Sequence, residues 1–316
     1  MMTHPTSPLR LAVSGRLARS LVSALSLETS DLRARAVSAS HLSPADLEWT
    51  DAYAGFSLPD NLGDSHVGWV HSMNAGVDEM LAALQLVPRP VLLTRTVGRM
   101  PQKVARYVLA HVLGEVEHIV PYDDQQRSRL WRPLETEVEP GTPVTILGTG
   151  ALGSAVALAF RAIGSPTSGV SRHGAPNPAF DRVVPSSRAR GECQGNRVVI
   201  STLPLTLETA GFVSTSLLDG LENAVFVNVG RGATVVLDDL RRALNEDRLR
   251  RAILDVFEAE PLPKDSWCWG HPKVTVTPHV AGLTDERDVL EDLLQTYGDI
   301  AAGREPGRSV SRSRGY

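Results

Sequence analysis

The stretch VTILGTGALGSAVALAF, residues 144–160, places a Gly148-x-Gly150-x-x-Gly153 pattern between an apolar strand-like run and an apolar helical run. In that context Gly148 permits a tight turn, Gly150 lets backbone N–H groups approach a pyrophosphate, and Gly153 lets helix and strand pack closely. The N-terminus of the helix adds a favourable dipole for the anion. The pattern therefore predicts a strand–turn–helix that binds a dinucleotide. The expected cradle comprises Gly148, Gly150, Ala151, Leu152 and Gly153.

Further strand-like runs follow this fingerprint at regular intervals. They are PTSGVS (166–171), RVVIST (197–202), AVFVNV (224–229), RAILDV (251–256) and KVTVTP (273–278). With the fingerprint strand they make six strands with intervening helices, which predicts a doubly wound parallel sheet. The segment RVVPSSRARGECQG (182–195) is unusually polar for the short amphipathic helix expected there. The sequence therefore does not define the edge of the adenine pocket.

The region before about residue 95 has the same alternation on a smaller scale. Its strand-like runs are RLAVSG (10–15), RARAVS (33–38), DAYAGFSL (51–58), VGWVHSM (67–73) and PVLLTRT (90–96). They predict a small α/β unit with a parallel sheet. A long helix is expected from Pro101 to about Val120, followed by a proline-rich loop.

A last helical stretch, residues 285–303, follows the final strand and is expected to return to the first domain. The predicted organisation is therefore a discontinuous substrate domain, residues 1–98 and 283–316, and a dinucleotide-binding domain, residues 99–282. A length of 316 residues suits two domains of this kind.

Composition excludes several classes of protein. Apolar residues make up 42% and charged residues 22% of the chain, and the net charge of −4 points to neither nucleic acid nor an anionic membrane. Cys193 and Cys268 have no metal-binding or redox spacing, so we expect two inert cysteines, no metal and a cytoplasmic protein. No apolar run reaches the length of a membrane span, about 18 residues.

Both ends of the chain allow two interpretations. Residues 9–27 carry arginines and serines without an acid, as transit peptides do, but a first strand followed by a short helix is the favoured interpretation. The C-terminal sequence GREPGRSVSRSRGY (303–316) is rich in Arg, Ser and Gly and predicts a disordered tail rather than an RNA-binding one.

The end of the second strand of the larger region bears on cofactor choice. A site for NAD usually has an acid there, but this chain has Ser171 and Arg172 in the sequence GVSRHG. A guanidinium pairs well with a 2′-phosphate, so we favour NADPH, with NADH still possible. The alternative is that Arg172 stacks on the adenine or points into solvent.

Chemically versatile residues follow three other strand-like runs. Arg231 lies between two glycines after AVFVNV, Asp255 ends RAILDV with Glu260 just beyond it, and His279 follows KVTVTP. The carboxyl ends of strands in an open α/β sheet form the crevice where ligands bind. The pattern therefore predicts that these side chains share one site.

The set of motifs resembles the D-isomer-specific 2-hydroxyacid dehydrogenases, and most of all their glyoxylate/hydroxypyruvate reductase branch. The matching motifs are SMNAGVD (72–78), ILGTGALG (146–153), STLPLTLETAG (201–211), FVNVGRGATV (226–235), LDVFEAEPLP (254–263) and VTPHVAG (276–282). The resemblance implies a doubly wound (Rossmann) cofactor domain with a smaller flavodoxin-like α/β substrate domain. It also implies reduction of a small 2-keto acid, such as glyoxylate or hydroxypyruvate, to the 2-hydroxy acid.

The resemblance also assigns roles by position. Arg231 would hold and polarise the 2-keto acid, His279 would protonate the carbonyl oxygen, and Glu260 would orient and charge the imidazole. Asp255 matches the position that meets the nicotinamide carboxamide. The remaining assignments are Asn74, Ala75 and Gly76 for the substrate carboxylate, and Leu203, Pro204, Thr206 and Val229 for the cofactor. The family's dimers imply a homodimer through the helix that begins at Pro101.

Other interpretations stay open at this point. The same fold serves as a non-catalytic dinucleotide sensor that binds protein partners, and formate oxidation occurs on a related scaffold. Glu260 argues against formate oxidation, because those enzymes carry an amide beside the histidine. His111 and His271 are expected to be structural, Arg106 has no assigned role, and Trp267 and Trp269 cover either the substrate pocket, a partner or a core.

Overall fold

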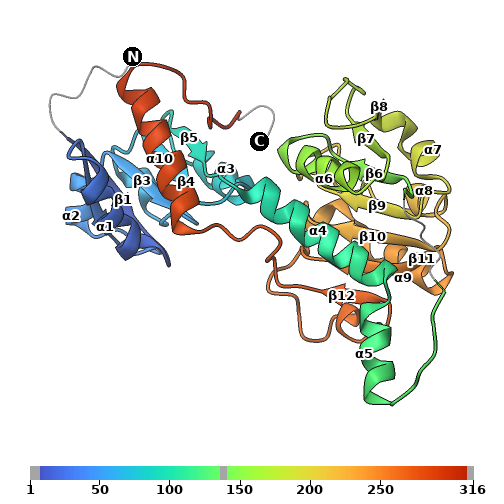
Figure 1. The fold of residues 1–316 in the computed structure, drawn as a ribbon. Helices are drawn as coiled ribbons and strands as arrows, with labels where there is room; N and C mark the ends of the chain where they lie inside the picture. Colours follow the sequence, from blue (N-terminus) through green and yellow to red (C-terminus); the bar gives the residue numbers. More distant parts are fainter. Residues whose placement is uncertain (1–7, 136–140, 312–316) are drawn as a thin grey trace. The chain divides into compact units, whose positions relative to one another are not determined.

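The computed structural model describes residues 8–135 and 141–311, which form two compact units (Figure 1). Unit 1 comprises the described residues up to Met100 together with those from Thr284 onward, and unit 2 runs from Pro101 to Leu283. Unit 2 is thus continuous in sequence, whereas unit 1 is made from both ends of the chain. Within the described ranges, no helix is long and apolar enough to cross a membrane.

Unit 2 is built on a seven-stranded parallel sheet with the order β12-β11-β10-β9-β6-β7-β8. Its strands are β6 (Val144–Leu147), β7 (Thr167–Ser171), β8 (Arg182–Pro185), β9 (Val198–Ser201), β10 (Ala224–Asn228), β11 (Leu249–Leu254) and β12 (Val274–Val276). Its helices are α4 (Met100–Val116), α5 (Ile119–Arg127), α6 (Ala151–Ala162), α7 (Ala189–Cys193), α8 (Thr215–Leu218) and α9 (Leu237–Asn245).

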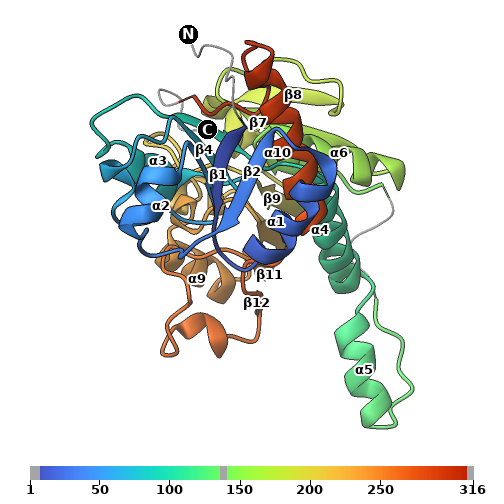
Figure 2. The same cartoon turned by 90° about the vertical axis from the view of Figure 1, so that its left-hand side faces the viewer.

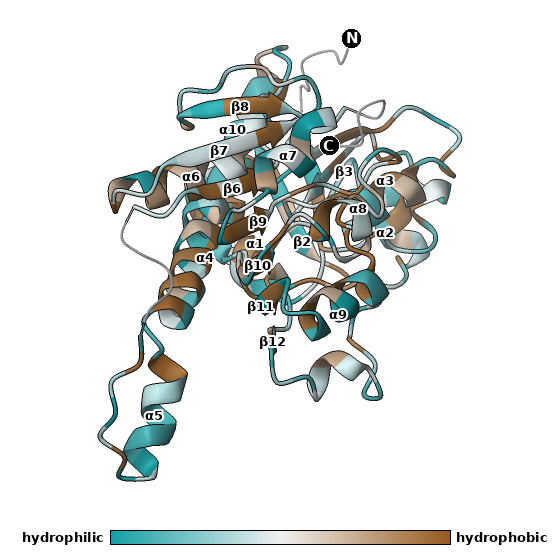
Figure 3. Ribbon diagram, turned by 90° about the vertical axis from the view of Figure 1, so that its right-hand side faces the viewer, coloured by the Kyte–Doolittle hydropathy of each residue, from teal (hydrophilic) through white to brown (hydrophobic). Residues whose placement is uncertain are grey.

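The expected doubly wound sheet is confirmed. Helices α7, α8 and α9 share one apolar cluster with the strands, while α4 and α6 lie on the other face (Figure 1). The central strands are hydrophobic along their length (Figure 3), as strands covered on both faces must be. The carboxyl ends of all the strands consequently meet at one edge of the sheet.

Unit 1 holds a five-stranded parallel sheet with the order β2-β1-β3-β4-β5, the flavodoxin-like arrangement expected. Its strands are β1 (Leu9–Val13), β2 (Leu32–Ala36), β3 (Ala52–Gly55), β4 (Trp69–Ser72) and β5 (Leu92–Arg95). Its helices are α1 (Ala18–Glu28), α2 (Pro44–Trp49), α3 (Asp78–Leu84) and α10 (Glu286–Ala301). Helices α1 and α10 lie side by side (Figure 2) and pack into one core with β1, β3 and β4.

Two expectations about the secondary structure of unit 2 are wrong in detail. The sheet of unit 2 has a seventh strand, β8, which the polar segment 182–195 forms before the short helix α7. This strand pairs only with β7, so its half-exposed residues lack the continuous apolar pattern of a central strand. The long helix stops at Val116, because His118 adopts φ +53° and α5 then begins at Ile119.

The C-terminal tail differs from the expected disorder as far as Ser311. Val310 donates its backbone N–H to the carbonyl of Leu93 at 2.9 Å, and Ser309 forms an antiparallel bridge with Thr94. These contacts occupy the outer edge of β5, whose backbone groups need partners. Residues 312–316 of the predicted tail lie outside the described residues.

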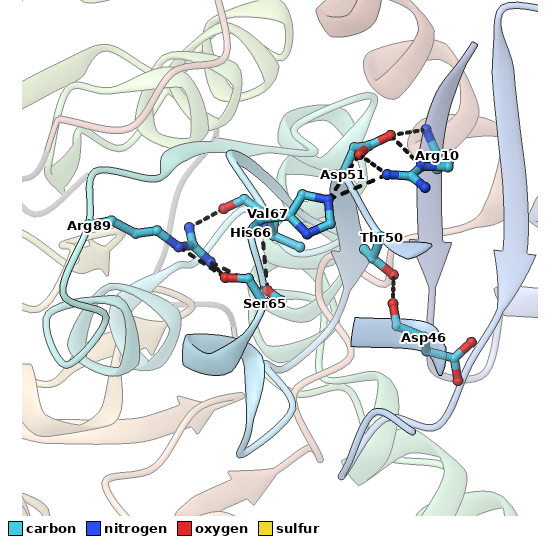
Figure 4. A network of polar contacts seen from close by, with 8 residues as sticks. All are labelled: Arg10, Asp46, Thr50, Asp51, Ser65, His66, Val67 and Arg89. Atoms are coloured by element: carbon cyan, nitrogen blue, oxygen red, sulfur yellow. Dashed lines mark hydrogen bonds and ion pairs between the residues drawn. The ribbon is translucent and has the colours of Figure 1, made fainter. Parts of the chain in front are cut away.

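A polar network joins β1 to the loops of unit 1 (Figure 4). The guanidinium of Arg10 donates to both carboxylate oxygens of Asp51 at 2.9 and 2.7 Å, and the imidazole of His66 lies 3.1 Å from the same carboxylate. Burial alone raises the pKa of Asp51, but the hydrogen bonds from Arg10 and His66 outweigh it and lower that pKa to about 2.

Replacing Asp51 by Asn should therefore weaken unit 1 in a pH-dependent way. The pKa of the folded carboxyl lies below the ordinary value of 3.8, so its contribution is complete above about pH 4 and is lost as the pH falls toward about 2. We expect the variant to unfold about 1–2 kcal/mol more easily at pH 7, discounted for partial exposure, with the gap closing on acidification. Urea unfolding followed by circular dichroism between pH 7 and pH 3 measures this, with the exposed Asp60→Asn as control.

Candidate active site

The glycine-rich turn joins β6 to α6 and packs closely against the first turn of that helix. Gly148 has φ +101°, and a Cβ added to Gly153 would lie 2.0 Å from the carbonyl oxygen of Gly148. A Cβ added to Gly150 would instead meet nothing within 4 Å. The turn is therefore closed on the protein side and open above the N-terminus of α6, which fits a bound pyrophosphate. Ala151 and Leu152 form the first residues of that helix.

Ser171 and Arg172 lie at the carboxyl end of β7, directly beside β6 in the sheet. The hydroxyl of Ser171 accepts a hydrogen bond from the backbone of Gly174 at 3.1 Å. Arg172 reaches Glu208 in the loop after β9, with Nη2 and Oε2 at 3.1 Å, and both side chains are largely exposed. An exposed pair of this kind contributes little, so a stronger anion can displace Glu208 from the guanidinium.

The loop after β9 carries three of the residues assigned to the cofactor, Leu203, Pro204 and Thr206. Leu203 is buried, and the hydroxyl of Thr209 donates to the carbonyl of Pro204 at 2.6 Å and accepts from the backbone of Thr206 at 2.8 Å. A Cβ added to Gly230 would lie 2.4 Å from the carbonyl oxygen of Leu203. The loops after β9 and β10 therefore touch through their backbones.

The loop that carries Arg231 is braced by Asn228, the last residue of β10. The Asn228 amide accepts from the backbone N–H of Gly230 at 3.1 Å and donates to the carbonyl of Arg231 at 3.0 Å. A Cβ added to Gly232 would lie 1.9 Å from the carbonyl carbon of Phe257. The two glycines around Arg231 are thus required by close packing, and the packing sets Arg231 against the loop that leads to Glu260.

Glu260 and His279 form a direct pair. Oε2 of Glu260 lies 2.8 Å from Nδ1 of His279, and Oε1 accepts from the backbone N–H of Phe257 at 2.8 Å. The imidazole is 51% exposed and the carboxyl 34%, so the pair is fixed on one side and accessible on the other. With Nδ1 held by the carboxylate, Nε2 is the nitrogen that can exchange a proton with a ligand.

Asp255 lies at the carboxyl end of β11 and is 1% exposed. One oxygen accepts from the hydroxyl of Thr277 at 2.6 Å and from the backbone N–H of Val280 at 2.8 Å, and the other accepts from Ala281 at 2.9 Å. Its carbonyl accepts from the N–H of His279 at 2.9 Å. The carboxylate therefore secures the turn around His279, a role that its position in the sequence did not reveal.

The segment Asn74–Gly76 follows β4 in unit 1. The hydroxyl of Ser72 accepts from the N–H of Asn74 at 3.1 Å and donates to its carbonyl at 3.0 Å, and Arg95 donates to the carbonyl of Ala75 at 3.0 Å. The segment is half-buried. A tight turn thus presents backbone groups at the carboxyl edge of the smaller sheet.

Several residues were missed or given no role from the sequence. Asn228 and Thr277 stand inside recognised motifs, but short polar residues at strand ends are too common to signal a brace. Tyr107 lies in the helix α4, and its hydroxyl is 2.6 Å from that of Thr277, a contact across 170 positions that no local pattern announces. Trp267 packs beside the core of unit 2, and Trp269 is 54% exposed with its N–H on Pro263.

Comparison with known proteins gives a family. A sequence model described as "D-isomer specific 2-hydroxyacid dehydrogenase, NAD binding domain" matches residues 109–281, more than half of the chain. An uncharacterised protein encoded in the mprR 3′ region of Streptomyces coelicolor is 38% identical over 259 residues, which cover 80% of this chain and 91% of that one.

Solved structures agree along the whole chain. A D-isomer-specific 2-hydroxyacid dehydrogenase from Xanthobacter autotrophicus Py2, in complex with NADPH and MES, has a TM-score of 0.89 at 29% identity, covering 98% of this chain and 100% of that one. An NADPH-dependent glyoxylate/hydroxypyruvate reductase from Sinorhizobium meliloti, in complex with NADP and sulfate, has a TM-score of 0.85 at 26% identity, with the same coverage.

Replacing the second and the third glycine of the fingerprint, Gly150 and Gly153, should have different effects. In Gly153→Ala the new methyl group collides with backbone, so we expect a loss of several kcal/mol of stability, on the scale of severe packing mutations. In Gly150→Ala it enters open space, so the melting temperature should stay within a few degrees while NADPH affinity falls about tenfold or more. Thermal unfolding and titration of nicotinamide fluorescence measure the two effects. A Gly150→Ala variant with wild-type affinity would contradict the assignment of the cradle.

Proposed function

Because this chain belongs to the D-isomer-specific 2-hydroxyacid dehydrogenases, oxidoreductases that use a nicotinamide dinucleotide, we propose that it reduces a small 2-keto acid such as glyoxylate or hydroxypyruvate. The product is the corresponding 2-hydroxy acid. The observation that carries the proposal is the Glu260–His279 pair at 2.8 Å, half exposed, on a loop packed against the one that bears Arg231.

The residues of unit 2 divide the chemistry among them. Arg231 binds the carboxylate and carbonyl oxygens of the substrate with its planar guanidinium, and so increases the positive character of the carbonyl carbon. The bound dinucleotide supplies the hydride. Nε2 of His279 donates a proton to the carbonyl oxygen, while Glu260 stabilises the imidazolium through Nδ1. In unit 1 we assign Asn74, Ala75 and Gly76 to the substrate carboxylate, because their turn presents backbone groups.

We assign NADPH as the preferred form of the cofactor. Arg172 follows β7 where a carboxylate would otherwise meet the ribose, and its present partner Glu208 is held only at 3.1 Å in an exposed pair. A 2′-phosphate offers the guanidinium more negative charge and one more acceptor oxygen than a carboxylate, and the exposed pair with Glu208 is weak. The NADPH and NADP complexes of similar proteins are consistent with this assignment. Asp255 keeps its assignment to the nicotinamide carboxamide, alongside its contacts to the turn.

We also assign a homodimer, on the basis of a segment of unit 2. Helix α5 and the residues that follow it, 119–135, form an arm that projects from the sheet of the same unit (Figure 3). The arm is held internally by Leu130 donating to the carbonyl of Gln125 at 2.8 Å, yet Trp131 is 97% exposed and Val120 is 63% exposed. An ordered arm with outward apolar side chains suits a second copy of the chain. Light scattering that finds only monomer would contradict it.

Arg231→Ala and His279→Ala should reduce activity in different ways. Loss of the arginine removes binding in both the ground state and the transition state, so KM should rise and kcat should fall. Loss of the histidine should lower kcat by about 10²–10⁴-fold and change KM little. The decrease in absorbance of NADPH with glyoxylate, hydroxypyruvate, pyruvate and bulkier 2-keto acids measures both.

Arg106→Ala and His271→Ala serve as matched controls and should retain wild-type rates. If the wild-type protein oxidises NADPH with none of these acids, the reductase is excluded and the dinucleotide-sensing interpretation replaces it. An unchanged rate in His279→Ala would remove the assigned proton donor.

Arg172→Ala should change cofactor preference without harming the fold. We expect the dissociation constant of NADPH to rise about 10–100-fold, as for loss of a charge-assisted contact, and that of NADH to stay within about twofold. Arg197, which precedes β9 at the opposite edge of the same sheet, supplies the control Arg197→Ala. Equal losses for both cofactors would mean that Arg172 contacts the adenosine rather than the phosphate.

A further inference from the structure

The turn that presents His279 has a backbone conformation that few residues other than glycine adopt. His279 has φ +54°, in the left-handed region, where residues with a side chain are strained. Such a turn persists only if its surroundings fix it. The contacts that fix it come from the Asp255 carboxylate, which accepts from the backbone N–H groups of the next two residues, Val280 and Ala281, at 2.8 and 2.9 Å.

The carboxylate is in turn fixed by a pair of hydroxyl groups. The hydroxyl of Thr277 donates to Asp255 at 2.6 Å, and the oxygen of Thr277 lies 2.6 Å from the hydroxyl of Tyr107 in α4. Thr277 has a single hydroxyl hydrogen, which it gives to the carboxylate, so Tyr107 must be the donor in the second bond. The two hydrogen bonds therefore run in the same direction: Tyr107 donates to Thr277, and Thr277 donates to Asp255.

The surroundings keep Tyr107 a donor. Burial raises its pKa to about 12; the hydrogen bond with Thr277 opposes the rise and the charge of Asp255 adds to it. The ring of His111 packs against that of Tyr107 with centroids 4.3 Å apart, and burial lowers the pKa of His111, against the opposing charge of Asp255. The tyrosine therefore stays protonated and its ring stays in place through the neutral pH range.

We propose that Thr277 and Tyr107 are positioning residues for His279: through Asp255 they hold the strained turn that directs its imidazole. The inference rests on the proposed role of His279 as proton donor and adds two residues to the machinery that serves it. It also explains why a carboxylate lies buried here beside two hydroxyl groups. A displacement of about 1 Å at the reacting groups is enough to cost up to about 10²-fold in rate, so the brace has a measurable effect.

The test compares Thr277→Val, which keeps the shape but not the hydroxyl, with Thr277→Ser, which keeps the hydroxyl. Thr277→Val should lower kcat about tenfold, with KM for the 2-keto acid within about twofold, and Thr277→Ser should remain close to wild type. Tyr107→Phe keeps the ring and should lower kcat severalfold. The double variant Thr277→Val/Tyr107→Phe should be no slower than Thr277→Val alone, because both act along one chain.

The variant Thr277→Val/His279→Ala separates positioning from general damage. It should be no slower than His279→Ala alone, because Thr277 acts through the imidazole. Wild-type kcat in Thr277→Val, or an equal loss with and without His279, would overturn the proposal, as would failure of Thr277→Ser to restore the rate.

A second readout does not depend on turnover. The imidazole NMR signal of His279, identified by its absence in His279→Ala, should shift in Thr277→Val and not in Thr277→Ser. If the wild-type protein reduces no 2-keto acid, the proposed function fails, but this signal still decides the brace. An unchanged signal in Thr277→Val would overturn it.

Discussion

Backbone packed directly on backbone, with no side chain between, is the constraint on which this site depends. At the carboxyl edge of the larger sheet, Gly153 meets Gly148, Gly230 meets Leu203, and Gly232 meets Phe257, each within a distance that no Cβ can enter. The loops after β9, β10 and β11 therefore contact one another directly through their backbones. The close approach also sets the loop of Arg231, after β10, against the loop that leads from β11 to Glu260. Gly153, Gly230 and Gly232 consequently cannot be replaced by a residue with a side chain unless the backbone shifts.

The charges of the site are treated in two ways, according to burial. The Glu260–His279 pair is partly exposed, so solvent or a ligand can reach it. Asp255 is almost completely buried, and its charge is compensated by one hydroxyl and two backbone N–H groups rather than by a cation. Hydrogen bonds of that kind are strong and directional. The buried acid thus holds the turn around His279, while the proton transfer proposed above falls to the accessible pair.

The sequence predicts the layout of both sheets because β-branched runs of buried strands differ so clearly from helical periodicity. It places Arg231, Asp255, Glu260 and His279 at strand ends, and the Glu260–His279 pair is where the motifs lead one to expect it. The sequence does not reveal which residues far apart in the chain will meet, so the contact of Tyr107 with Thr277 could not be predicted. The edge strand β8 was missed because its residues are polar. The end of α4 was missed because the residue with positive φ there is His118, not a glycine. The glycine-rich turn after β6 could be predicted because its glycines have a fixed spacing, whereas a contact between two hydroxyl groups has no spacing in the sequence.

The smaller unit is assembled from both ends of the chain, and this has a consequence for biosynthesis. Val289 and Leu293 of α10 belong to the same core as Leu11 and Leu21, so that core lacks part of its apolar packing until α10 has left the ribosome. Residues 101–283, in contrast, form one unit that is continuous in sequence. Although domains generally fold in the order of their synthesis, we expect the dinucleotide-binding half to reach its native state first here, while the N-terminal strands wait, exposed to chaperones and proteases, for the last helix.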